Sequence, residues 1–155
     1  MNIVITGANP TQRKYITSIV EFCVKKMMPR MTNIEIQVKL KSIKGDVYGY
    51  CMADPEGEAK RGDRPRVFEL EISKKLTLRK LLETIAHEMV HVKQYARGEL
   101  YEGDCNKHRW QGKWLSKEPD YWEQPWEIEA HGREPGLFIR WTETNKLAHK
   151  KWTQV

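Results

Sequence analysis

The segment from Thr77 to about Arg97 constrains the fold of this chain most strongly. Apolar residues recur in it at spacings of three and four, which is the period of an amphipathic α-helix. Gly98 follows as a natural C-terminal stop. We therefore predict one long helix whose apolar face packs on another layer of the protein. The residues of that face are Leu78, Leu81, Leu82, Ile85, Met89 and Val92.

The same helix carries the sequence His87-Glu88-Met89-Val90-His91. At 100° per residue, the two histidines lie about 40° apart on a face away from the apolar stripe, and they are separated by about 6 Å of helical rise. Two imidazoles placed in this way can chelate one ion at a Zn–N distance of about 2.1 Å. Glu88 projects beside the ion, so it can accept a proton from water activated by the metal. The alternative is a pair of surface histidines on a solvated helix face.

A second segment, Pro125-Trp126-Glu127-Ile128-Glu129-Ala130-His131, supports the metal site. Pro125 is suited to open a short helix. A catalytic zinc ion with two histidines needs a third protein ligand and an open position for water. Glu127 lies 36 residues after His91, and a glutamate from a second helix would complete such a site.

Together these residues resemble the gluzincins, metallopeptidases with two histidines from H-E-x-x-H and a downstream glutamate. The resemblance covers about residues 77–133, and small gluzincin-like chains of this kind occur in bacteria and bacteriophages. It implies a zinc metallopeptidase in which His87, His91 and Glu127 bind Zn²⁺ and Glu88 is the general base. Several of these families continue as E-x-E-A-D from the ligand, which favours Glu127 over Glu129.

His131 stands where those families often place the aspartate. Because it lies one turn after Glu127, it faces the same way. We predict that it orients a ligand through a hydrogen bond or stabilises the oxyanion, with simple surface exposure as the alternative, whereas Glu129 is expected to be a solvated helical carboxylate. Tyr95, Tyr121 and Arg133 are further candidate oxyanion donors, and no spacing rule selects among them.

His108 is the competing third ligand, 17 residues after His91. It resembles the third histidine of SprT-like proteases, which act on DNA-bound proteins, but those families place a glycine directly after the histidine and here Gly112 comes four residues later. The metzincin third histidine is absent, since Gln94 and Arg97 occupy its motif positions. Glu127 is therefore favoured. A SprT-like protease and a non-catalytic zinc-stabilised or nucleic-acid-binding module remain as alternatives.

The remainder of the chain alternates between strand and helix patterns. We predict a strand at Asn2–Thr6, then a helix that Asn9 caps and that continues to about Met28, where Pro29 ends it. Three further strands follow, of which the second returns after a hairpin turn at Lys44-Gly45-Asp46. The predicted strands are centred on residues 34–40, Val47–Met52 and Phe68–Ile72.

These elements predict one α+β domain over residues 1–155. We expect a small zincin-like domain with a twisted, mainly antiparallel sheet, the active-site helix and a C-terminal helical part. The segment Asp54–Arg66, rich in Gly, Pro and charge, is predicted to be a mobile loop. An exposed strand at about Val67–Ile72 is expected to pair with extended peptide substrate.

Composition and charge limit the classes of partner that this chain is expected to bind. The net charge of +6 comes from residues 1–100, with 18 Lys and Arg against 12 Asp and Glu, whereas the remainder carries nine of each. No block of five like charges exists, so nucleic acid is possible but not favoured, and a peptide or protein substrate is expected. All six tryptophans lie from Trp110 onward. We expect most of them in the core, with some lining a peptide groove.

Cysteine usage and hydropathy bear on the compartment. Cys23, Cys51 and Cys105 are odd in number, and none belongs to a Cys-x-x-Cys pair. Neither a disulfide framework nor a zinc knuckle follows, and reduced thiols are expected. No signal peptide or membrane span is visible. The sequence therefore predicts a cytoplasmic protein without a membrane partner.

Overall fold

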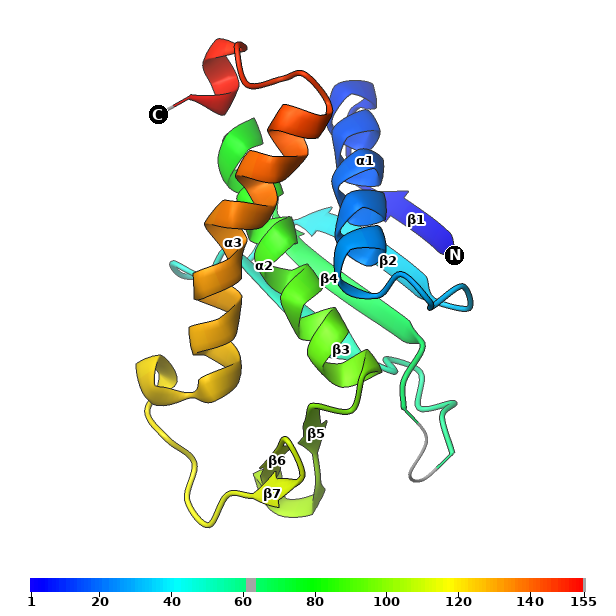
Figure 1. The fold of residues 1–155 in the computed structure, drawn as a ribbon, viewed down its shortest axis with the longest axis vertical. Helices are drawn as coiled ribbons and strands as arrows, with labels where there is room; N and C mark the ends of the chain where they lie inside the picture. Colours follow the sequence, from blue (N-terminus) through cyan, green and yellow to red (C-terminus); the bar gives the residue numbers. More distant parts are fainter. Residues whose placement is uncertain (61–63, 155) are drawn as a thin grey trace.

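The computed structural model describes residues 1–60 and 64–154, and these form an α+β arrangement (Figure 1). In chain order the strands and α-helices are β1 (Asn2–Thr6), α1 (Pro10–Met27), β2 (Glu35–Lys41), β3 (Gly49–Ala53), β4 (Val67–Ser73), α2 (Leu78–Ala96), β5 (Leu100–Glu102), β6 (His108–Trp110), β7 (Lys113–Trp114) and α3 (Pro125–Thr144). Short 3-10 helices lie at Asp104–Asn106, Tyr121–Glu123 and Lys151–Thr153.

The two predicted helices in the first two thirds of the chain form close to their expected bounds. The Asn9 side chain accepts a hydrogen bond from the Gln12 backbone N–H at 2.8 Å, and the Gln12 side chain accepts one from the Asn9 N–H at 3.0 Å. This capping box fixes the start of α1. Thr77 caps α2 in the same position, and Gly98 follows it with a φ of +73°.

The four-stranded sheet has the order β1-β2-β4-β3. β1 pairs with β2, and β2 pairs with β4, in parallel register, and only β3–β4 is antiparallel. The prediction of a mainly antiparallel sheet is therefore wrong for this sheet. Alternation of apolar and polar residues identifies a half-buried strand, but it does not give the direction in which the neighbouring strand runs.

The predicted hairpin between β2 and β3 is also wrong, because β4 lies between them. Phe68, Leu70 and Ile72 of β4 are completely buried, whereas Tyr50 and Met52 of β3 are 47% and 38% exposed. The more apolar strand takes the interior position and β3 takes the edge. The prediction of an exposed strand at about Val67–Ile72 is wrong for the same reason, because β4 pairs with a strand on each side.

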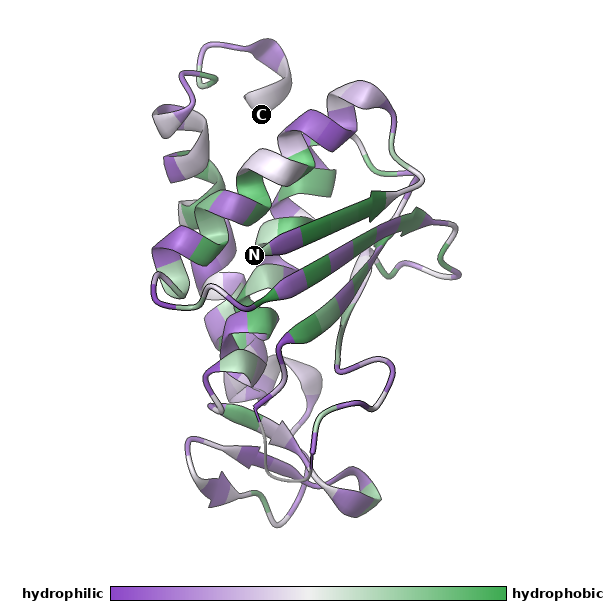
Figure 2. Ribbon diagram, turned by 90° about the vertical axis from the view of Figure 1, so that its right-hand side faces the viewer, coloured by the Kyte–Doolittle hydropathy of each residue, from purple (hydrophilic) through white to green (hydrophobic). Residues whose placement is uncertain are grey.

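Helices α1 and α2 cover one face of this sheet, and α3 packs beside α2 (Figures 1 and 2). The core lies between the sheet and α1 and α2, while the opposite face carries ion pairs such as Lys39–Glu69 at 2.7 Å. Two of the six tryptophans, Trp126 and Trp141, are buried, and Trp114 and Trp122 are exposed, so the prediction of mostly core tryptophans is wrong.

The chain between α2 and α3 forms a small antiparallel sheet, β5-β6-β7, beyond the C-terminal end of α2 (Figure 1). Its strands of two or three residues are too short for a periodic signal, and the sequence analysis missed them. In the predicted loop Asp54–Arg66, the described residues form neither strand nor helix, and 61–63 lie outside the described residues. None of the described helices is long and apolar enough to cross a membrane.

Candidate metal centre

Two histidines of α2 and one glutamate of α3 converge at the interface between these helices. His87 and His91 lie one turn apart, and Glu127 lies in the first turn of α3. The distance from His87 Nε2 to Glu127 Oε2 is 3.3 Å, and from His91 Nε2 to Glu127 Oε1 it is 3.2 Å. Ligand atoms around tetrahedral zinc lie about 3.3 Å apart at usual bond lengths. Each histidine Nε2 therefore lies about as far from a Glu127 oxygen as two ligand atoms of one zinc ion lie from each other, and one potential ligand atom from each of the three residues lies within 4.8 Å of the others.

Both histidines are 8% exposed, so they are not the solvated surface residues of the alternative interpretation. Every residue of α2 from Thr84 to Gln94 is buried, because α1, the sheet and α3 all pack against this helix. A buried imidazole needs partners for both ring nitrogens, which makes the surroundings of each histidine informative.

The second nitrogen of each histidine has a fixed partner. His87 Nδ1 lies 3.1 Å from Glu134 Oε2, and His91 Nδ1 lies 2.8 Å from Gln94 Oε1. The Gln94 amide donates to the Trp126 carbonyl at 2.9 Å, and this bond orients its oxygen toward His91. Acceptors at both Nδ1 atoms select the tautomer whose Nε2 lone pair is free for a metal.

The sequence analysis missed both partners. Glu134 lies seven residues after Glu127, two helical turns along the same face of α3, but this spacing alone does not show that the face meets His87. Gln94 lies three residues after His91, within reach of its ring on the same helix face.

The surroundings shift the proton affinities of these groups. Burial lowers the pKa of His87, but hydrogen bonds to Glu127 and Glu134 outweigh it and raise this pKa to about 9. For Glu127, burial acts to raise the pKa, and hydrogen bonds from His87 and His91 hold it well below the usual range. Without metal, the imidazoles of His87 and His91 pair with the Glu127 carboxylate. The protons on these imidazoles then supply the positive charge that a divalent metal ion would supply.

Glu88 stands beside this group and is 6% exposed. Burial raises its pKa, while the neighbouring histidines oppose the rise. Glu88 lines a cavity of about 600 Å³ together with His87, His91 and Glu127. A carboxylate whose pKa is raised, facing the same cavity as a candidate set of metal ligands, is suited to accept a proton from water.

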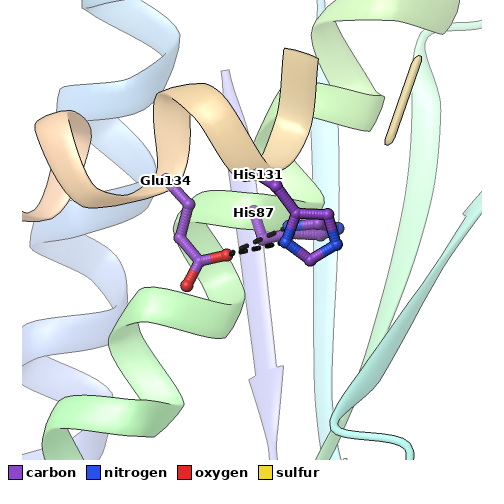
Figure 3. A group of neighbouring side chains, drawn as sticks. All are labelled: His87, His131 and Glu134. Atoms are coloured by element: carbon purple, nitrogen blue, oxygen red, sulfur yellow. Dashed lines mark hydrogen bonds and ion pairs between the residues drawn. The ribbon is translucent and has the colours of Figure 1, made fainter. Parts of the chain in front are cut away.

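Three aromatic and polar side chains of α3 and the segment before it form the rim of the cavity. The Tyr121 hydroxyl donates to Glu127 Oε2 at 2.9 Å and lies 3.0 Å from His131 Nε2. The His131 ring centroid is 4.5 Å from that of His87 and 4.9 Å from that of Trp122 (Figure 3 shows the two histidines with Glu134). His131 thus contacts the candidate ligand Glu127 through Tyr121, and it also lines the cavity.

The expectation that Glu129 is a solvated carboxylate is wrong. Its two oxygens accept hydrogen bonds from Lys93 at 2.9 and 2.7 Å, and Gln94 also donates to it. Lys93 is 6% exposed and needs an anionic partner to be buried there. Glu129 therefore binds α3 to α2 next to the candidate metal ligands.

His108 lies away from the ligand group, in β6. Its ring stacks on Trp126 with centroids 4.9 Å apart, and its nitrogens lie 3.7 Å from carboxylate oxygens of Glu102 and Glu118. Among the residues that the structure describes, the groups able to hold a metal contain His87, His91, Glu127, His131 and Glu134, and they do not contain His108.

Comparisons with family models, curated proteins and solved structures return no match for this chain.

Proposed function

We propose that this chain is a zinc-dependent metallopeptidase of the gluzincin type that acts on a peptide or protein in the cytoplasm. One observation carries the proposal: His87, His91 and Glu127 offer their ligand atoms within 4.8 Å of one another, and Glu88 lines the same cavity. Two imidazoles and one carboxylate are one of the ligand sets of catalytic zinc, and the second carboxylate nearby can serve as the base in metal-assisted hydrolysis.

Each residue has a stated task in this mechanism. His87, His91 and Glu127 would hold the ion, and all three residues line the cavity. Zn²⁺, when bound there, supplies Lewis acidity that activates water and polarises the scissile carbonyl. Glu88 accepts the proton of the attacking water and delivers it to the leaving amine. Tyr121 and His131 lie at the rim, where a hydroxyl or imidazole can donate to the developing oxyanion.

We propose that extended substrate binds along the edge strand β3. Gly49, Tyr50 and Cys51 line the cavity, and β4 is the one strand with which β3 pairs in the described part of the chain. The outer edge of β3 therefore offers backbone donors and acceptors to a peptide laid along the cavity. This assignment replaces Val67–Ile72, which lies inside the sheet.

The Glu88→Gln variant tests the proposal. Glutamine keeps the size of the side chain but cannot accept the proton, so hydrolysis of a peptide library should fall below detection while one zinc per chain is retained. The matched control is Glu83→Gln on the same helix, which should keep full activity. Undiminished turnover in Glu88→Gln would remove the assigned base and with it the mechanism.

The two rival functions predict other results. A SprT-like protease would lose zinc on replacement of His108 and would be stimulated by DNA. A non-catalytic zinc-stabilised or nucleic-acid-binding module would bind zinc, show no peptide cleavage and be indifferent to Glu88. The placement of His108 among Glu102, Glu118 and Trp126 supports neither a ligand role nor the first rival.

A further inference from the structure

Beside the proposed zinc ligands, a second group of metal-ligating side chains converges. His131 and Glu134 lie three residues apart on α3 and face His87 of α2 (Figure 3). Glu134 Oε2 lies 3.1 Å from His87 Nδ1 and 3.9 Å from His131 Nδ1. One potential ligand atom from each of the three residues lies within 4.8 Å of the others.

This second group has the same chemistry as the first: two imidazole nitrogens and one carboxylate oxygen, the donor set that favours zinc and similar divalent transition metals. The 3.1 Å between Glu134 Oε2 and His87 Nδ1 is already close to the separation of about 3.3 Å around a tetrahedral ion, whereas the 3.9 Å between Glu134 Oε2 and His131 Nδ1 would have to shorten by about 0.6 Å. The side chain of His131 is 38% exposed and lines the cavity, so it can move and an ion can reach it from solvent.

We propose that His131, Glu134 and His87 Nδ1 form a second, weaker site for a divalent transition metal, and that an ion bound there inhibits the enzyme. The two sites share His87, with Nε2 directed to the first ion and Nδ1 to the second. Binding of the second ion releases the Nδ1 proton to solvent and replaces the His87–Glu134 hydrogen bond, which makes this site weaker than the first. Inhibition rests on the proposed peptidase function, whereas the metal site does not.

Inhibition follows from the position of the second ion. His131 and Glu134 line the cavity that substrate would enter, so an ion held by them occupies part of that space. The same ion takes Glu134 away from its role of orienting His87 toward the first site. A chain with both sites filled therefore has a narrowed cavity and a perturbed first ligand.

Zinc titration of the full chain, with Zn²⁺ alone as the probe, separates the two sites. Wild type should bind one equivalent tightly and a second at least tenfold more weakly by calorimetry. His131→Ala should lose the second equivalent and keep the first, while His91→Ala should do the reverse. Glu134→Gln provides a second variant for the weaker site, and replacement of the exposed His149 by Ala is the control that should bind as wild type does.

A single equivalent in wild type would overturn the proposal, as would a second equivalent that persists in both His131→Ala and Glu134→Gln. The activity measurement compares each protein with itself, at one equivalent and at excess zinc. Excess zinc should reduce peptide cleavage at least tenfold in wild type and less than twofold in His131→Ala. If no variant or wild type cleaves peptide, the peptidase function fails, and the titration still decides whether the second site exists.

Discussion

The α2–α3 interface holds two buried histidines beside glutamates and the small sheet β5-β6-β7 holds one partly buried histidine beside glutamates, yet only the interface brings histidine and carboxylate within ligand distance. At the interface, His91 has Gln94 on one nitrogen and Glu127 at 3.2 Å from the other. In the small sheet, His108 has carboxylate oxygens no nearer than 3.7 Å, and its Nδ1 is buried without a hydrogen-bond partner among the described residues. A histidine beside acidic groups is thus not sufficient, since the ring must also be oriented by its second nitrogen.

Replacement of a candidate zinc ligand should reveal the largest difference between these two regions, measured as the change in zinc affinity. Structural zinc binding of 10–16 kcal/mol, divided over four ligands, corresponds to roughly 3 kcal/mol per ligand, so His91→Ala and Glu127→Ala should each weaken zinc binding by roughly 200-fold or more. His108→Ala should change the affinity by less than about threefold. Competition with a chromophoric chelator measures all three, and a stronger effect of His108→Ala than of Glu127→Ala would reverse the comparison.

The stability of the metal-free protein should depend on pH through His87. Its folded pKa of about 9 lies above the ordinary 6.5, so the ion pair with Glu127 and Glu134 stabilises the fold fully below pH 6.5. That contribution is lost as the pH rises through 9, which should lower the free energy of unfolding by about 3 kcal/mol. Urea unfolding with chelator at pH 6.5 and 9.5 measures the loss. An equal loss in His87→Gln would show that another group causes it.

The ion pair of Lys93 with Glu129 should contribute more to stability than a surface pair. Glu129→Ala leaves the buried Lys93 with Glu99 as its remaining partner, at 2.6 Å, so the expected loss is about 2 kcal/mol, less than for a buried charge left alone. The matched control is Glu143→Ala, whose partner Arg140 is 72% exposed, with an expected loss below about 1 kcal/mol. Equal losses in chemical denaturation would contradict a locking role for Glu129.

The smallest predicted effect concerns the orientation of His87. Glu134→Gln keeps an acceptor near Nδ1 but removes the negative charge, and such changes around ligating histidines typically cost 10–100-fold in metal affinity. Because an acceptor remains, we expect a loss of roughly tenfold at the first site. Glu118→Gln beside His108 should have no effect, and a change there of similar size would remove the distinction between the two regions.

Much of the candidate site could be predicted from local sequence, whereas the order and the directions of the strands in the sheet could not. The spacing of His87, Glu88 and His91 places them on one helix because an α-helix repeats every 3.6 residues, and Pro125 marks the start of the helix that carries Glu127. The direction of β2 relative to β4 and the edge position of β3 depend on pairing between distant segments. Alternation within a strand does not encode that pairing.

The contacts that orient the histidines also divide into those that local sequence could predict and those that depend on distant segments. The roles of Glu129 and Glu134 depend on which residues of α2 face α3, namely Lys93 and His87. No pattern within α3 alone distinguishes a solvated glutamate from one that binds a buried lysine across the interface. Gln94, three residues from His91 on the same helix, was the one partner within reach of a local argument.

Diffraction at the zinc absorption edge, from crystals grown with one equivalent of zinc, tests the central claim most directly. We predict one anomalous peak between Nε2 of His87, Nε2 of His91 and the carboxylate of Glu127, at about 2.0–2.2 Å from each. A zinc-loaded chain whose peak lies at His108, or anywhere that leaves Glu127 without a bond to the ion, would contradict it.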